Sequence, residues 1–161
     1  MKKLVKTFIF LFSILFISSC SPKVPDPPIE EPFTGSLVNI LTINDIHGAA
    51  ESTSSNAGLA KMSTKINKMR EQYGKDNIVL LCAGDTFQGQ FVSNVTKGRV
   101  MIEAMNEMGF DGTTIGNHEF DWGLDEILKY FDGNTDNGEA NFPIGCANLY
   151  YKYTNKKIEN L

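Results

Sequence analysis

Three short polar clusters contain residue types that can bind metal ions and move protons. They are residues 44–48 (NDIHG), 84–85 (GD) and 116–121 (GNHEFD), and each follows directly after an apolar run. Imidazole and carboxylate groups together suit Zn²⁺, Mn²⁺ and similar divalent ions. The clusters can form one metal site only if the fold brings them together.

The first two clusters and Asn117 have the ligands for two neighbouring ions. Asp45 and His47, two positions apart in an extended chain, project to the same side and can hold one ion. Asp85 has two carboxylate oxygens and can bridge that ion to a second ion, to which Asn117 offers a neutral carbonyl oxygen. Two metal ions about 3.5–4 Å apart polarise a phosphoryl group and activate a water molecule. We therefore predict a site for two divalent metal ions.

The third cluster also contains a candidate acid. His118 lies next to Asn117 in the chain and can face a bound phosphate. Asp121, three residues further on, can fix the tautomer of His118 and raise its basicity, which suits a general acid for the leaving alkoxide. Four glycines in and near the clusters allow the backbone to approach ions and phosphate: Gly48, Gly84, Gly89 and Gly116.

The elements that must position these residues alternate along the chain. Apolar, β-branched runs predict strands over residues 37–43, 78–83, 113–115 and 142–147, the first two of them buried. Apolar stripes with helical spacing predict helices over residues 59–73, 101–108 and 124–131. The predicted fold class is α/β, with a mainly parallel sheet and helices packed on its faces.

This alternation predicts that the clusters converge. Asp45 and Asp85 are separated by 40 residues, and Asp85 and Asn117 by 32. One strand–helix–strand unit needs about 30 residues, so each interval fits one unit. Right-handed crossovers bring the carboxyl ends of parallel strands to one edge, where α/β sheets bind their ligands. We expect the same edge to carry Asp45, His47, Asp85, Asn117 and His118.

The motifs NDIHG, GDTFQG and GNHEFDWG resemble the three N-terminal motifs of the calcineurin-like metallophosphoesterases, in the form used by the 5'-nucleotidase and 2',3'-cyclic-nucleotide phosphodiesterase branch. The resemblance runs from Asn39 to Asn148. It implies part of a metallophosphoesterase domain of the α+β sandwich type. It also implies a hydrolase of nucleotides, cyclic nucleotides or nucleotide sugars that works with two divalent metal ions outside the cytoplasm.

Matched motif by motif, the resemblance assigns the same roles as the residue chemistry. Asp45 and His47 match ligands of the first metal, Asp85 the bridging ligand and Asn117 a ligand of the second metal. His118 and Asp121 match the catalytic dyad.

The end of the chain departs from the family pattern. Family members supply further ligands from downstream histidines, including a Gly-His-x-His motif, whereas this chain has 2 His, both already assigned. We therefore expect an N-terminal part that is inactive alone. Two alternatives stay open: a lipid-anchored binding module or pseudoenzyme with the same fold, and a related hydrolase of thiosulfate esters. Metal content tests the first, and a substrate panel tests the second.

Residues 1–19 are predicted to be a lipoprotein signal peptide. Three lysines, Lys2, Lys3 and Lys6, precede a short apolar run at residues 8–17. A membrane-spanning helix needs about 20 apolar residues, so this run is too short for one. Residues 17–20 (ISSC) look like a bacterial lipobox, which predicts lipidation of Cys20; the alternative is an ordinary signal peptide with a chance Cys at its end.

The signal peptide and the lipobox predict how the chain is divided and where the protein is located. Residues 1–19 are removed, residues 20–36 form a proline-rich tether, and residues 37–161 form the N-terminal portion of the metallophosphoesterase domain. The lipid would anchor the protein to a membrane of the cell envelope, on its periplasmic or extracellular face. Export permits a disulfide between Cys82 and Cys146, although two buried thiols are the commoner outcome, and the sequence leaves both open.

The net charge limits the kinds of partner that the protein is expected to bind. The formal net charge is −4, and it becomes −7 without the three lysines of residues 1–19. An acidic body argues against a nucleic acid polymer as partner, because such binding depends on Lys and Arg neutralising phosphates. A nucleotide or other phosphoester substrate must then be held locally by metal ions, and no protein partner is inferred.

Overall fold

The computed structural model describes residues 35–154 and 156–158. The predicted signal peptide, the lipidation site Cys20 and residues 20–34 of the tether lie outside the described residues. Residues from Ser36 onward form one compact unit. Within the described residues, no helix combines the length and the apolar character needed to cross a membrane.

Within the described part of the chain, four parallel strands form one sheet, and their spatial order is the same as their order in the chain. They are β1 (Asn39–Ile43), β2 (Ile78–Cys82), β3 (Gly112–Thr114) and β4 (Ile144–Gly145). Since the order never reverses, every right-handed crossover places its helix on the same face of the sheet.

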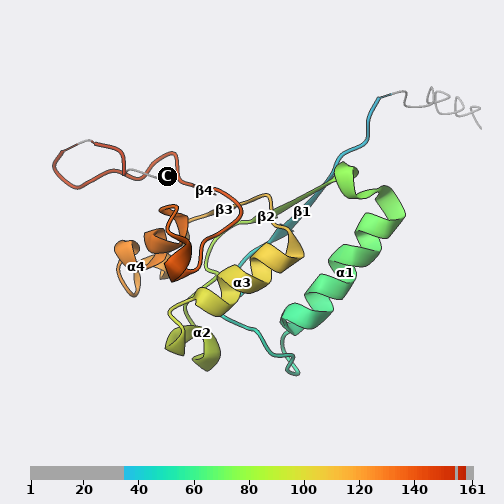
Figure 1. Ribbon diagram of the computed structural model, residues 1–161, viewed down its shortest axis with the longest axis horizontal. Helices are drawn as coiled ribbons and strands as arrows, with labels where there is room; N and C mark the ends of the chain where they lie inside the picture. Colours follow the sequence, from blue (N-terminus) through green and yellow to red (C-terminus); the bar gives the residue numbers. More distant parts are fainter. Residues whose placement is uncertain (1–34, 155, 159–161) are drawn as a thin grey trace, which may run out of the picture. The chain divides into compact units, whose positions relative to one another are not determined.

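In the described residues, four α-helices connect the strands (Figure 1). They are α1 (Gly58–Tyr73), α2 (Phe91–Val95), α3 (Arg99–Met108) and α4 (Leu124–Leu128). Short 3-10 segments lie at Lys75–Asn77, His118–Phe120, Lys129–Phe131 and Thr135–Asn137. The core lies between the helices and one face of the sheet, and it includes Ile66 of α1, Leu80 and Cys82 of β2, and Met101, Ile102 and Met105 of α3.

The end of α3 shows how the helical layer is held together. Gly109 has φ +65° and ends the helix in the left-handed conformation, and the N–H of Phe110 donates to the carbonyl of Met105. Arg70 of α1 donates to the carbonyls of Met108 (2.6 Å) and Gly109 (2.9 Å). The free carbonyls of one helix end therefore tie α3 to α1.

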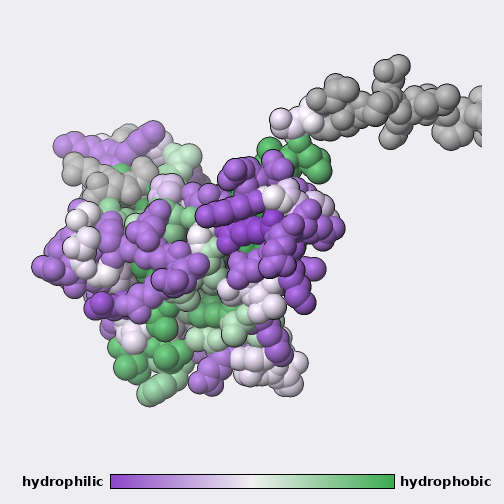
Figure 2. Space-filling model, turned by 45° about the vertical axis from the view of Figure 1, so that its right-hand side comes forward, coloured by the Kyte–Doolittle hydropathy of each residue, from purple (hydrophilic) through white to green (hydrophobic). Residues whose placement is uncertain are grey.

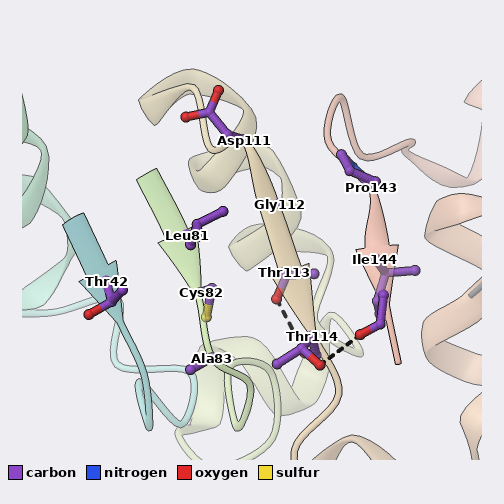
Figure 3. Close-up of a pocket in the computed structure, with 11 residues that line it drawn as sticks. Thr42, Leu81, Cys82, Ala83, Asp111, Gly112, Thr113, Thr114, Pro143 and Ile144 are labelled. Atoms are coloured by element: carbon purple, nitrogen blue, oxygen red, sulfur yellow. Dashed lines mark hydrogen bonds between the residues drawn. The ribbon is translucent and has the colours of Figure 1, made fainter. Parts of the chain in front are cut away.

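The opposite face of the sheet carries no helix among the described residues. Ile40 on this face is 65% exposed. A shallow hollow of ≈ 470 Å³ lies across the face and is lined by Thr42, Leu81 and Thr114 from three neighbouring strands (Figure 3). Among the described residues, the helices therefore cover one face of the sheet. The reason is the strand order, which sends every described crossover to one side.

Among the described residues, the structure has the four predicted strands with different ends: β3 is shifted by one residue, and the other three are shorter than predicted. Leu37 and Val38 precede β1 and are exposed, and the predicted strand at 142–147 contributes only the two residues of β4. β1 is also not buried: its side chains alternate between part-buried and exposed, because it is an edge strand with one open face.

The helices differ from the predictions in smaller ways. The predicted helix at 124–131 is α4 followed by a 3-10 turn, and α2 was not predicted. α2 presents Phe91 and Val95 to solvent, 82% and 65% exposed, and apolar side chains show along the lower edge of Figure 2.

Cys82 is buried and Cys146 partly exposed, and both are free thiols.

Candidate metal centre

The first two polar clusters are held together by their backbones. Beyond the last paired residues of β1 and β2, the N–H of Asp45 donates to the carbonyl of Gly84 (3.1 Å), and the N–H of His47 donates to the carbonyl of Asp85 (3.0 Å). The loop after β1 therefore runs beside the loop after β2, and the side chains of Asp45, His47 and Asp85 start from neighbouring backbone positions.

These three residues share an unusual backbone conformation. Their φ angles are 54° for Asp45, 49° for His47 and 51° for Asp85. The expectation that Asp45 and His47 project from an extended chain is therefore wrong. The left-handed conformation costs an L-residue about 1–2 kcal/mol, and the hydrogen bonds between the loops offset that cost. The two side chains still approach each other, with His47 Nε2 3.9 Å from Asp45 Oδ1.

Three potential metal ligands come together at His47, Asp85 and His118. Each offers one ligand atom, and these atoms lie within 4.8 Å of one another. The two imidazole rings have centroids 4.9 Å apart and an interplanar angle of 80°. His47 Nδ1 lies 3.3 Å from the carbonyl oxygen of Gln88, which leaves Nε2 available to an ion in the way typical of metal-binding histidines. Two imidazoles and a carboxylate fit a divalent ion of the zinc or manganese type.

His118 is held by the predicted dyad partner. Its Nδ1 lies 2.8 Å from Asp121 Oδ2, because the 3-10 turn at His118–Phe120 brings positions three apart to the same side. The hydrogen bond to Asp121 raises the pKa of His118 above 6.5; the negative charges of Asp121, Asp85 and Glu119 also raise it, while desolvation lowers it. At a given pH, the protonated form, which can donate a proton, is therefore more populated than in an unperturbed histidine.

The other two predicted ligands lie nearby but are not part of this group. Asp45 is beside His47, and its carboxylate accepts a hydrogen bond from the side-chain amide of Asn44. Asn117 is exposed, and its side chain takes part in none of the hydrogen bonds found in the described part of the chain. The structure thus gathers two of the four predicted metal ligands, His47 and Asp85, together with the predicted acid His118.

One residue of the site was not identified from the sequence. Glu119 is 1% exposed, and its carboxylate accepts the backbone N–H groups of Asp85 (2.8 Å), Thr86 (2.8 Å), Gly116 (2.7 Å) and Phe87 (3.4 Å). Its signal in the sequence was that Glu119 is an acid inside the GNHEFD cluster with no assigned role. Its burial cannot be read from the sequence.

The glycines of the clusters have a more specific role than predicted. A Cβ atom on Gly116 would lie 2.3 Å from Asp85 Oδ1, and one on Gly84 would lie 2.5 Å from the backbone nitrogen of Gly116. A Cβ on Gly89 would lie 2.3 Å from the carbonyl oxygen of His47. These glycines allow the three loops to contact one another, because any side chain at these positions would collide with a neighbouring loop.

Known proteins match this chain over the region that contains the site. The family model for calcineurin-like phosphoesterases matches residues 38–158. The snake venom 5'-nucleotidase of Gloydius brevicauda is 36% identical over 126 residues, which cover 70% of this chain and 20% of that protein. The 5'-nucleotidase of Bos taurus is 35% identical over 130 residues, covering 71% of this chain and 21% of that protein.

Solved structures match the fold as well. The NAD nucleotidase of Haemophilus influenzae aligns with a TM-score of 0.56 and 28% identity, covering 66% of this chain and 20% of that one. The 5'-nucleotidase precursor of Thermus thermophilus aligns with a TM-score of 0.57 and 25% identity, covering 68% and 22%. The chain spans about a fifth of the length of the curated relatives named above, which are 20% and 21% covered.

Proposed function

The chain belongs to the calcineurin-like phosphoesterase family, and we propose that the full-length protein hydrolyses phosphoesters of nucleotides outside the cytoplasm. The observation that carries the proposal is the group of His47, Asp85 and His118, whose ligand atoms lie within 4.8 Å of one another. All three lie beyond the carboxyl ends of parallel strands, where α/β folds bind ligands. The similarity to 5'-nucleotidases supports a nucleotide as substrate.

The ligand residues are proposed to divide between two ions. Asp45 and His47 would hold the first, Asp85 would bridge both, and Asn117 would contribute to the second. When bound, the ions would supply positive charge to the phosphoryl oxygens and lower the pKa of a water molecule. The acidic body of the chain makes this local positive charge necessary for binding a phosphate.

His118 is proposed to protonate the leaving group. Asp121 holds Nδ1, so Nε2 can face the ester oxygen and donate a proton as the bond to phosphorus breaks. The raised pKa of His118 supports this role, since it increases the protonated fraction near neutral pH. Asp121 orients the ring and stabilises its charge.

The location is a separate proposal, supported by the sequence of the N-terminal segment. Cleavage before Cys20 and lipidation of its thiol would leave the protein attached to a membrane of the cell envelope. The proline-rich residues 20–36 would hold the domain away from that membrane. The substrate would then be a nucleotide outside the cytoplasm.

Two substitutions in the full-length protein test the proposed roles. Asp85→Ala is expected to lose bound metal and activity together, because Asp85 would contact both ions. His118→Ala is expected to keep the metal and to lower turnover about 10²–10⁴-fold, as for loss of a general acid. The measurements are metal content by mass spectrometry and hydrolysis of AMP, cyclic nucleotides, nucleotide sugars and a thiosulfate ester.

The control is Asp125→Ala, an exposed acid in the first turn of α4. It should change neither readout. Equal loss of metal in the Asp85 and His118 variants would assign His118 as a ligand and would contradict the division of roles. Bound metal without turnover of any ester by the unmodified protein would instead favour the pseudoenzyme alternative.

A further inference from the structure

Glu119 connects two loops of the candidate site from a buried position. Its Oε2 accepts the N–H groups of Asp85 and Gly116 at 2.8 and 2.7 Å, and its Oε1 accepts those of Thr86 and Phe87 at 2.8 and 3.4 Å. One side chain thus binds the loop after β2 and the start of the loop after β3. No ion pair joins it to a cation in the described part of the chain.

These contacts require a carboxylate of this length. Each oxygen accepts two N–H groups, and four backbone donors are satisfied by one negative charge. Glutamine would place an NH₂ group, which only donates, against two N–H donors. Aspartate would keep the charge but withdraw it by one methylene. The backbone amides of the two loops are therefore matched to glutamate.

A further hydrogen bond joins the same two loops, with its donor on the loop after β3 and its acceptor on the loop after β2. The backbone N–H of His118 donates to Asp85 Oδ1 at 2.8 Å. Asp85 is thus held at its N–H by the carboxylate of Glu119 and at its own carboxylate by the N–H of His118. This double attachment holds Asp85 at φ +51°, a backbone conformation that an L-residue keeps only when the surroundings impose it.

We propose that Glu119 is a positioning residue for the metal site. Its carboxylate sets the register of the loop carrying Asp85 against the loop carrying His118, and so determines the distance between their ligand atoms. Glu119 makes no contact with the substrate or the ions in this role; it acts through the backbone of Asp85 and Gly116. The inference rests on the proposed metal-dependent function of the same site.

Glu119→Gln in the full-length protein is the principal test. The variant keeps the volume and one acceptor oxygen, and it leaves two backbone N–H groups facing a donor. Loss of a residue that orients metal ligands typically lowers metal affinity about 10–100-fold, and we expect a decrease of that size for Mn²⁺ and Co²⁺. Glu119→Asp, which keeps the charge, is the second variant and replaces Glu119→Gln if the latter does not fold.

Met105→Ala is the matched control for a loss of stability alone. Met105 is fully buried in α3, outside the two loops, and its truncation destabilises the core without removing a hydrogen bond of the site. It should leave metal affinity and the absorption spectrum of bound Co²⁺ unchanged. Glu119→Gln should change both, since the spectrum reports the arrangement of ligands.

A second measurement does not need the metal. In the metal-free protein, amide hydrogen exchange at Asp85, Thr86 and Gly116 should accelerate about tenfold or more in Glu119→Gln, as expected when buried hydrogen bonds are lost, while the amides of β2 stay protected. Unchanged exchange at these amides, or metal affinity and Co²⁺ spectra equal to those of the unmodified protein, would overturn the inference. If the unmodified protein binds no metal, the proposed function fails, and the exchange rates alone decide whether Glu119 holds the loops.

Discussion

At the scale of single residues, the candidate ligands combine unfavourable backbone conformations with useful side chains. Asp45, His47 and Asp85 account for three of the five non-glycine residues with positive φ in the described part of the chain. Such conformations cluster at functional sites, where the surrounding structure imposes them. Here the backbone bonds between the loops and the carboxylate of Glu119 supply that constraint.

The interaction of His118 with Asp121 leads to a prediction about pH. The hydrogen bond to Asp121 is the largest cause that raises the pKa of His118 above 6.5. A raised pKa means that the charged imidazole is favoured in the folded state, so its stabilising effect is present below pH 6.5 and is lost as the pH rises through the folded-state pKa. Asp121→Asn should therefore lower the pKa of His118 toward 6.5.

This change can be measured by following the ring protons of His118 by NMR in the metal-free protein. In the full-length enzyme, the alkaline limb of the plot of kcat against pH should move in the same direction, to lower pH. Asp125→Asn, which removes an exposed acid that does not contribute to this pKa, should leave the titration in place. A titration of His118 that is the same in all three proteins would contradict the prediction.

At the scale of elements, the site depends on loops that touch at their backbones. The loop after β1 is bonded to the loop after β2, which is bonded in turn to the loop after β3 through Glu119 and Asp85. The strands supply the starting points of these loops, and the glycines permit the contacts between them. A side chain at one contact should therefore disturb ligands on a different loop.

Gly116→Ala tests this dependence against Gly145→Ala. Neither glycine has a positive φ, so the two substitutions differ in what the new methyl group meets. At Gly116 it would lie 2.3 Å from Asp85 Oδ1, and at Gly145 nothing lies within 4 Å. Overpacking of this kind costs about 1–3 kcal/mol, so Gly116→Ala should lower the free energy of unfolding by that amount and weaken metal binding.

Chemical denaturation and metal titration would measure the two effects. Gly145→Ala should change each of them little. If the two variants proved equally stable and equally able to bind metal, the loops after β2 and β3 would have more freedom than their contacts indicate.

At the scale of the whole molecule, residues 1–161 are expected not to catalyse the reaction at a useful rate. The chain spans about a fifth of its relatives, with 20% and 21% of their lengths covered. Of the residues proposed to bind metal, Asp85 and Asn117 would hold the second ion, and metal affinity depends on the number of ligands. Within the described part of the chain, one face of the sheet also carries no helix, whereas parallel sheets are normally covered on both faces.

The purified segment should therefore be inactive toward AMP and an aryl phosphodiester, even with added Mn²⁺ or Zn²⁺. The full-length protein, assayed in parallel, is the positive control. Metal-dependent turnover by the segment at the rate of the full-length protein would show that further ligands are dispensable.

The attachment of the whole protein to a membrane gives the last prediction. Lipidation of Cys20 should make the protein expressed in bacteria partition into detergent, and Cys20→Ala should abolish this. Cys146→Ala is the matched control, because Cys146 is a free thiol within the folded domain. Intact-mass analysis that found cleavage elsewhere and an unmodified Cys20 would exclude the anchor.

Much of this fold was predictable because its signals are local. Apolar runs and helical stripes predicted the four strands and the main helices, and the polar clusters at the strand ends predicted which residues would gather. Periodicity and residue type are properties of short segments, so a mainly parallel sheet and the approach of His47 to Asp85 could be inferred from them. The ends of strands and the short helix α2 could not, since they depend on pairing and packing.

The remaining features were decided by the tertiary structure. Glu119 and Asp85 are 34 residues apart in the chain, and only the folded backbone brings a carboxylate of one loop to the amides of another. The same is true of the face of the sheet that carries no helix among the described residues. Hydrogen bonds and burial depend on distances between segments that are remote in sequence, whereas residue types and their spacing determine only which contacts are possible.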